Sequence, residues 1–148
     1  MADPTPTDPA AYPHWVTERV RFSDTDAMGH VNNVSMAAHI ESGRVALSFD
    51  LLSRLDVGDR TIILRRLEVD YLAEVRFPAE LRVGSRLAAV GRTSFTVETG
   101  VFRDDVCVAT SRGVLVVVGP DGPAPIEGEG RALLEAELPG GGQGRRAR

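Results

Sequence analysis

The chain has 148 residues, a hydrophobic fraction of 43% and a formal net charge of −4, which together favour a single globular domain with one core. The negative charge argues against nonspecific nucleic-acid binding, because such binding needs a basic surface that neutralises phosphates. The longest apolar run, Val114 to Val118, is far shorter than the roughly 20 residues of a membrane helix. The first residues also lack the basic start and apolar stretch of a secretory signal, so we expect a cytoplasmic protein with no membrane partner.

The N-terminal residues 1–13 contain four prolines and few apolar side chains, a composition that predicts a disordered arm. A first strand is expected from Val16 to Phe22, where Val16, Val20 and Phe22 share one parity. This strand leads directly into a loop that is rich in polar residues.

One long helix is expected to begin near Asn32 or Asn33, both favourable N-cap types, and to run to about Leu55. Its apolar residues spread round more than one face, which predicts a helix that is largely covered. Gly43, in the middle of this segment, costs about 1 kcal/mol relative to alanine, and close packing of the helix backbone on a sheet would offset that cost.

The remainder of the chain reads as strands with turn residues between them, at about 61–76, 80–91, 94–103 and 106–118. A tight hairpin is predicted at Arg103 to Val106. One strand, one long helix and four antiparallel strands form an α+β plan in which a curved sheet of about five strands wraps the helix, as in a hotdog fold. We therefore expect the domain at 14–119, followed by a largely flexible tail at 120–148 with a short helix around Arg131 to Leu138.

The polar loop before the helix concentrates two acids, a glycine, a histidine and two asparagines between Ser23 and Asn33. A carboxylate there lies close to a helix start, where the first backbone N–H groups lack partners and can face a developing negative charge. Both Asp24 and Asp26 fit this position, and spacing alone does not separate them. The loop is the predicted active site.

Other residues of the loop each have a chemical and a structural interpretation. His30 is either a general base, a group that orients Asp26 or the attacking water, or a structural histidine. Gly29 permits a positive φ, so the N–H groups from Gly29 to Val31 could form an oxyanion site, or the segment could simply be a tight turn.

The run from Arg21 to Asn33, continued by Ile40 to Arg44, resembles the signature of hotdog-fold acyl-CoA thioesterases of the 4-hydroxybenzoyl-CoA thioesterase type. Its Gly-His-Val-Asn-Asn portion is also similar to plant acyl-carrier-protein thioesterases. The resemblance implies hydrolysis of an acyl thioester without a metal or other cofactor, in at least a dimer whose acyl pocket lies at the subunit interface. It also implies that Asp26 is the catalytic carboxylate.

The sequence departs from the family pattern at two places. Met28 stands where the plant relatives carry an asparagine, and Met36 stands where an aromatic residue is usual. The substrate is expected to be an acyl-CoA or an acyl-carrier protein, with Asp26 acting either as nucleophile or as general base.

Further residues are candidates for substrate binding. Asn32 and Asn33 are read first as helix caps and loop braces. Glu41 is expected to pair with Arg44 three residues later, or else to activate water as a second carboxylate. Several arginines are candidate contacts for coenzyme A phosphates or ordinary solvated residues: Arg65, Arg66, Arg92, Arg103 and Arg112.

Two other functions remain as alternatives. A hotdog hydratase or dehydratase acting on enoyl or hydroxyacyl thioesters would pair an aspartate with a histidine, as Asp26 and His30 could, although His30 is followed by Val-Asn-Asn and no acid comes soon after it. A non-catalytic acyl-CoA-binding module would bind without turnover. Because a five-stranded sheet leaves unpaired edges, a homodimer or a dimer of dimers is expected.

Overall fold

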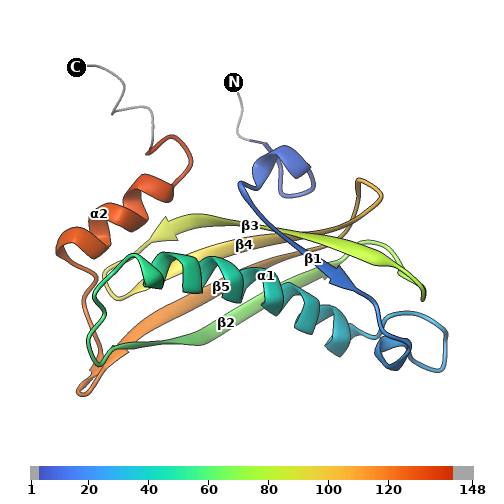
Figure 1. Cartoon of the computed structure of the whole chain (residues 1–148), viewed down its shortest axis with the longest axis horizontal. Helices are drawn as coiled ribbons and strands as arrows, with labels where there is room; N and C mark the ends of the chain where they lie inside the picture. The colour runs from blue at the N-terminus through green and yellow to red at the C-terminus, as the bar shows by residue number, and fades with distance from the viewer. Residues whose placement is uncertain (1–3, 142–148) are drawn as a thin grey trace.

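The computed structural model describes residues 4–141, which form one curved antiparallel sheet and a long helix in its concave face (Figure 1). The order in the sheet is β1-β3-β4-β5-β2, and the short β6 pairs with β5, so β1 and β2 are its edges. In chain order the elements are η1 (Pro9–Ala11), β1 (His14–Arg19), η2 (Phe22–Asp24), α1 (Asn33–Ser53), β2 (Thr61–Tyr71), β3 (Glu80–Val90), β4 (Ser94–Arg103), β5 (Val106–Gly119), β6 (Gly122–Pro123) and α2 (Gly128–Glu137).

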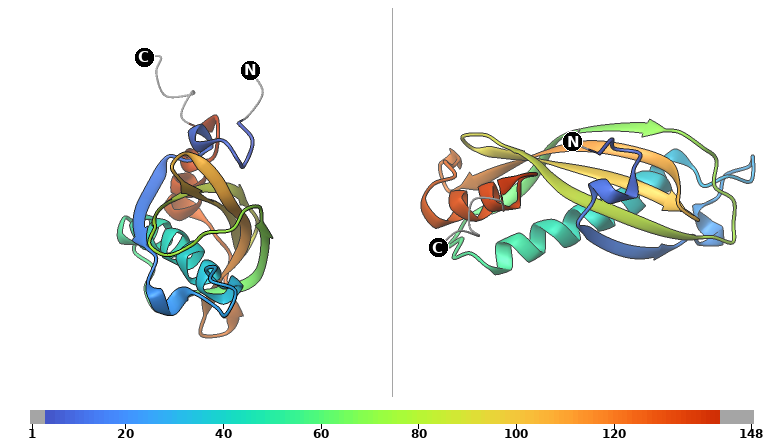
Figure 2. Two further views of the ribbon diagram at one scale, coloured as in Figure 1. Left: turned by 90° about the vertical axis from the view of Figure 1, so that its right-hand side faces the viewer. Right: turned by 90° about the horizontal axis from the view of Figure 1, so that it is seen from above.

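The sheet curls around α1, as the end view in Figure 2 shows. The helix begins where the side chain of Asn32 accepts the N–H of Ser35 at 2.8 Å, which satisfies one of the unpaired donors of the first turn. Gly43 faces the sheet, and a β-carbon there would lie 2.6 Å from Val83 Cγ1. The predicted close approach of the helix backbone to the sheet is confirmed.

The core divides into two clusters along α1. One surrounds the first half of the helix and contains Met36, Ile40 and Leu81. The other surrounds the second half and contains Leu47, Phe95 and, from the C-terminal region, Leu134. The sheet therefore contacts the helix over most of its length, and α2 closes one end of the core. This is the predicted hotdog fold.

Local differences from the sequence-based expectations occur at the ends of elements. The predicted first strand includes Phe22, but β1 ends at Arg19 and Phe22 lies in η2 with 75% of its surface exposed. The aromatic ring of Phe22 instead meets that of Phe77 edge to face, with centroids 5.7 Å apart. Parity alone could not separate a buried strand position from this exposed aromatic pair.

The expected disorder of residues 1–13 does not extend to Ala11 and Tyr12, which are buried against the sheet together with Phe102. The Tyr12 hydroxyl donates to the carbonyl oxygen of Pro6 at 2.6 Å, which fixes the chain before β1. At the other end, α2 is longer than the predicted fragment and buries Leu134 in the core. Both ends of the domain therefore reach beyond residues 14–119, while residues 1–3 and 142–148 lie outside the described residues.

The helix α1 is less covered than its apolar composition predicts. Its sheet-facing side is buried, but Val34, Val45 and Phe49 on the other side are exposed.

Within the described residues, no helix has the length and apolar character needed to cross a membrane.

Candidate active site

The polar loop is a short hairpin built on three pairs of backbone contacts. At its base, the N–H of Asn32 donates to the carbonyl oxygen of Asp24 at 2.9 Å. Thr25 and Val31 pair above them, and the N–H of Asp26 donates to the carbonyl oxygen of His30 at 2.9 Å. This ladder fixes the backbone of Asp26 immediately ahead of α1.

The Asp26 carboxylate lies at the exposed tip of this hairpin. Its Oδ1 atom accepts the N–H of Met28 at 2.9 Å, and the N–H of His30 approaches the same atom at 3.4 Å. Among residues 4–141, no group donates to the other oxygen, Oδ2. One oxygen therefore orients the side chain while the other is available to a substrate or a water molecule.

The turn at Gly29 has the positive φ that the sequence predicts, +79°. The predicted oxyanion donors are nevertheless engaged: the N–H of Gly29 donates to the carbonyl oxygen of Asp26 at 2.9 Å, and the N–H of Val31 donates to the carbonyl oxygen of Val75 at 2.8 Å. Within the described residues, no acceptor is found for the N–H groups of Asn33 and Val34, the first two of α1. The unpaired donors thus lie slightly later in the chain than predicted.

The His30 side chain contacts residues from the segment between β2 and β3. Its Nε2 atom lies 2.8 Å from Nη2 of Arg76 and 2.9 Å from Oε2 of Glu74. One ring nitrogen cannot accept a hydrogen bond from the arginine and donate one to the glutamate at the same time, so the two contacts need different positions of the ring protons. Within His30, the backbone N–H and not the imidazole contacts the Asp26 carboxylate.

Asn32 has the capping role that was expected first, whereas the contact of Asn33 comes from its backbone. Asn32 caps α1 through its side chain, and the carbonyl oxygen of Asn33 accepts the hydroxyl of Tyr71 at 3.1 Å. Tyr71 is the last residue of β2, so this contact joins the helix start to one end of the edge strand.

Glu41 pairs with Arg44, as predicted, with Oε1 3.5 Å from Nη2. The Glu41 side chain is 62% exposed, and among residues 4–141 its one ionic partner is Arg44. Burial of the Arg44 guanidinium lowers its pKa, an effect that the charge of Glu41 opposes. In the described residues, Nη1 of Arg44 is buried without a hydrogen-bond partner.

Two of the arginines expected as phosphate contacts, Arg66 and Arg92, pair with groups other than the Asp26 loop. Arg66 lies on β2 and pairs with Glu68 of the same strand. Arg92 lies in the turn between β3 and β4, where its carbonyl oxygen accepts the N–H of Ile126 from the segment before α2. The fold therefore separates Arg92 from the polar loop by approximately the length of α1.

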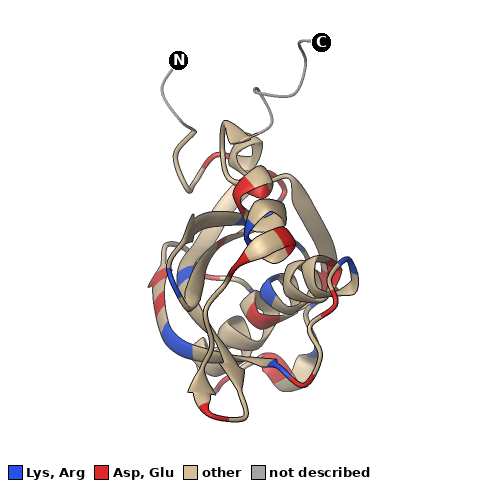
Figure 3. Cartoon of the chain, turned by 90° about the vertical axis from the view of Figure 1, so that its left-hand side faces the viewer, with Lys and Arg blue, Asp and Glu red and all other residues tan. Residues whose placement is uncertain are grey.

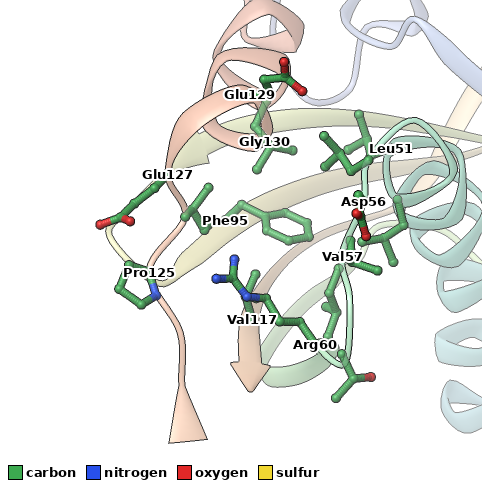
Figure 4. Close-up of a pocket in the computed structure, with 16 residues that line it drawn as sticks. Leu51, Asp56, Val57, Arg60, Phe95, Val117, Pro125, Glu127, Glu129 and Gly130 are labelled. Carbon is green, nitrogen blue, oxygen red and sulfur yellow. The ribbon is translucent and has the colours of Figure 1, made fainter. Parts of the chain in front are cut away.

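A cavity of about 300 Å³ lies at the far end of α1, opposite the polar loop. Figure 4 shows Phe95 directed into it and the carboxylate of Glu127 directed away. Arg60 is the one arginine among the residues that line it. Its walls are mainly apolar and come from the end of α1 and the segment after it, from β4 and β5, and from α2 and the segment before it: Leu51, Leu55, Phe95, Val117, Ile126 and Leu134. The cavity can hold an apolar group.

Figure 3 shows this end of the molecule, where acidic and basic residues are interspersed. Among residues 4–141, no group of three histidine, cysteine, aspartate or glutamate side chains has the arrangement of a metal site.

A second polar cluster lies beneath the loop, and no sequence pattern predicts it. His39 of α1 is buried between Glu18 of β1 and Asp24 of η2, with its ring nitrogens 3.0 and 3.2 Å from their carboxylate oxygens. Arg76 and Glu74 were likewise not predicted. Their contacts join segments that are distant in sequence, and local periodicity contains no information on such pairings.

The sequence of the chain is similar to that of known proteins. The pattern of the Thioesterase-like superfamily matches residues 20–134, which include the polar loop, α1 and all of the main strands after it. The uncharacterized protein YsmA of Bacillus subtilis strain 168 is 35% identical over 79 residues, which are 53% of this chain and 53% of YsmA. The chain thus spans about half the length of the curated relative that it matches.

Solved structures are similar over most of the chain. A thioesterase superfamily protein from Jannaschia sp. CCS1 has a TM-score of 0.76 and 31% identity, covering 87% of this chain and 85% of that one. A thioesterase from Thermus thermophilus, crystallised with coenzyme A and Zn, has a TM-score of 0.74 and 32% identity, covering 84% and 99% respectively. With its matching sequence pattern and its hotdog fold, the chain belongs to the Thioesterase-like superfamily.

Proposed function

We propose that this protein hydrolyses acyl-CoA thioesters and that Asp26 is its catalytic carboxylate. The observation that carries the proposal is the position of the Asp26 carboxylate just ahead of α1. Its Oδ1 atom is held by a hydrogen bond within the loop, and its Oδ2 atom is available to a substrate. Within the superfamily, the position of Asp26 in its motif supports assignment to the 4-hydroxybenzoyl-CoA thioesterase type. The coenzyme A bound to the Thermus thermophilus thioesterase supports acyl-CoA over an acyl-carrier protein as the substrate class.

The geometry is compatible with two routes to the same products. As a nucleophile, Oδ2 of Asp26 attacks the thioester carbon, the C–S bond breaks, and the thiolate leaves and takes a proton from solvent. Water then hydrolyses the mixed anhydride to release the acid and restore Asp26. As a general base, Asp26 instead takes a proton from the water that attacks the thioester carbon.

The oxyanion that forms in either route requires hydrogen-bond donors. We assign this role to the N–H groups of Asn33 and Val34, because they are unpaired within the described residues and lie in the first turn of α1. One such donor typically contributes about 2.7–4 kcal/mol to transition-state stabilisation. The amides of Gly29 and Val31 would have to give up existing hydrogen bonds to act in the same way.

The hydratase alternative receives no support from the loop. That chemistry needs an imidazole close to the carboxylate, whereas the ring of His30 contacts Arg76 and Glu74. We assign His30 to the support of the loop rather than to proton transfer.

We further propose that the working unit is a homodimer formed through β2. This strand is an edge of the sheet, and its unpaired backbone groups can pair with a second copy. The concave side beside it carries exposed Leu64 and the uncovered face of α1, including Val34 and Val45. The buried Nη1 of Arg44, unpaired among residues 4–141, lies in the same region, since Arg44 Cδ would be 3.3 Å from a β-carbon on Gly113 of β5. A second copy would cover these apolar groups and offer an acceptor to Arg44.

Pairing of two identical β2 strands around a two-fold axis is antiparallel. Within a protomer, β2 begins at the apolar cavity, which Thr61 and Ile62 line, and ends at Tyr71 beside the start of α1. The two-fold axis would therefore bring the cavity of the partner toward the Asp26 loop. We assign the acyl chain to this cavity and the coenzyme A phosphates to arginines outside it, with Arg92, which does not line the cavity, as the first candidate.

The test is release of free thiol from a panel of acyl-CoA thioesters of increasing chain length, with the matching acyl-carrier-protein thioesters in parallel. We expect turnover with at least one aliphatic or aromatic acyl-CoA. Tight binding of acyl-CoA without turnover across the panel would contradict the proposal and favour the non-catalytic binding module.

A further inference from the structure

The cluster of Glu18, His39 and Asp24 joins three elements beneath the candidate active site. His39 Nδ1 lies 3.0 Å from Oε2 of Glu18 on β1, and Nε2 lies 3.2 Å from Oδ2 of Asp24 in η2. The His39 side chain is only 8% exposed, and those of Glu18 and Asp24 are 28% and 14% exposed. A histidine from α1 is thus enclosed by two carboxylates from separate segments.

The chemistry of the three groups determines how many protons they hold. A carboxylate only accepts hydrogen bonds, so both ring nitrogens must carry hydrogen for both contacts to form while the two acids are ionised. Within residues 4–141, neither Glu18 nor Asp24 pairs with any other cationic side chain. A ring that carries hydrogen on both nitrogens donates to both carboxylates, and each contact is then a charge-assisted hydrogen bond.

Asp24 connects this cluster to the loop. Its Oδ2 atom also accepts the N–H of Arg21 at 2.8 Å, and its carbonyl oxygen accepts the N–H of Asn32 at the base of the hairpin. Asp26 lies two residues further on. The side chain of His39 therefore links the base of the hairpin to α1, independently of the covalent connection through Asn32.

We propose that His39 is a positioning residue: as an imidazolium between Glu18 and Asp24, it fixes the base of the hairpin to α1 and thereby sets the position of the Asp26 carboxylate. The expected effect of His39 on turnover rests on the proposed thioesterase function, whereas its expected effect on the structure of the hairpin does not. The groups that face His39 are Glu18 from β1 and Asp24 from η2, and both can accept a hydrogen bond from its ring.

Kinetic measurements compare His39→Gln with a matched control, His14→Gln. His14 pairs with Glu137 at 3.3 Å, in a more exposed contact that does not involve the loop. We expect His39→Gln to lower kcat by on the order of 10- to 100-fold with KM for acyl-CoA nearly unchanged, because a displaced carboxylate affects the chemical step rather than coenzyme A binding. His14→Gln should change neither constant. A wild-type kcat in folded His39→Gln would overturn the proposal.

Asp24→Asn tests whether His39 acts through Asp24. We expect its loss of kcat and that of His39→Gln to combine non-additively in the double variant, as they do for residues in one network. Full additivity would mean that His39 acts by another path and would overturn the proposal. If His39→Gln does not fold, Asp24→Asn and Glu18→Gln replace it in the comparison with His14→Gln.

Two further measurements need no activity. Nitrogen-15 NMR of the wild-type imidazole should show both ring nitrogens of His39 protonated at neutral pH, and a lone pair on either would overturn the proposal. Hydrogen exchange at the amides of Asp26 and Asn32 should accelerate in His39→Gln but not in His14→Gln, and unchanged exchange in His39→Gln would overturn the proposal. Should no acyl-CoA be turned over, the proposed function fails, whereas these two results still decide the role of His39.

Discussion

Gly43 of α1 and Val83 of β3 approach so closely that a β-carbon on the glycine would lie 2.6 Å from Val83 Cγ1 and 2.9 Å from the Ser85 hydroxyl oxygen. The absence of a side chain at Gly43 therefore sets the depth at which the helix lies in the sheet. That depth in turn places the first turn of α1, with its unpaired N–H groups, relative to the loop.

Gly43→Ala should destabilise the protein by about 1–3 kcal/mol, because the added methyl group displaces Val83 and outweighs the gain in helix propensity of about 1 kcal/mol. Denaturant unfolding measures the difference. The control is Gly130→Ala in α2, where the nearest atom to the new β-carbon is 3.8 Å away and stability should be unchanged or slightly higher. Equal stabilisation by both substitutions would contradict the close packing.

Asp26→Asn should lower turnover by at least about 100-fold, as expected for loss of a nucleophile or base. The amide oxygen can still accept the N–H of Met28, so the hairpin should be retained. Thiol release and circular dichroism provide the measurements. Asp121→Asn, in an exposed turn before β6, serves as the control. A nearly normal rate in Asp26→Asn would remove the residue from the mechanism.

Leu64→Lys should convert the dimer to monomers, because it places a second cation beside Arg44 on the concave edge of β2. Leu64 is 42% exposed in the protomer, so the fold itself should tolerate the change. Light scattering should give twice the 15.9 kDa chain mass for wild type and the single mass for the variant. Val106→Lys, at an exposed apolar position in the β4–β5 hairpin, should remain dimeric. Wild-type protein with the mass of one chain would contradict the assembly.

A shared site predicts complementation between two defective variants. Arg92→Ala should raise KM for acyl-CoA, and Asp26→Asn should abolish turnover. In a mixed dimer, one of the two sites combines an intact Asp26 with an intact Arg92 from the other subunit. Subunit exchange between the variants should therefore restore part of the thiol release at low substrate concentration. If Arg92→Ala lowers activity but the mixture shows no recovery, the two residues do not act across the interface.

The lowered pKa of Glu137 predicts that the stability of the protein depends on pH. Burial alone raises the pKa of Glu137, but hydrogen bonds and charges from Arg54 and His14 outweigh it and leave the pKa lowered. A carboxyl group whose pKa is lowered by folding stabilises the protein at pH values above its ordinary pKa, which is 4.5 for Glu137. This stabilisation is lost as the pH falls through the lowered pKa. Glu137→Gln should therefore be less stable than wild type near pH 7, with the difference shrinking below about pH 4.5. A difference that is constant with pH would exclude the ionised pair as its source.

The fold could be predicted from the sequence because its main features are local. The Asn32 cap, the long apolar helix, the mid-helix glycine and the alternating strands each leave a pattern over consecutive residues. The β4–β5 hairpin was predicted in the same way, and Asp104 and Asp105 adopt the positive φ angles of a two-residue turn. Phe22 was misplaced because an exposed aromatic pair and a buried strand position look alike in a single segment.

Much of the candidate site could not be predicted, because it depends on pairings across the fold. His39 and Glu18 are 21 residues apart, and only the docking of α1 against β1 brings them together. Arg76 reaches His30 from an irregular segment that has no periodic pattern. The reassignment of the oxyanion donors to Asn33 and Val34 likewise required knowledge of which amides were already bonded.

The edge strand β2 has 11 residues and joins the apolar cavity at one end to the start of α1 at the other. In the proposed dimer, every two-residue slip between the paired strands would move the partner's cavity by about 6.6–6.8 Å relative to Asp26. Substrate length would then be selected by the offset between subunits rather than by any residue of the loop. Proteins with an identical catalytic hairpin could accept acyl chains of different length solely through a change in how their two copies align.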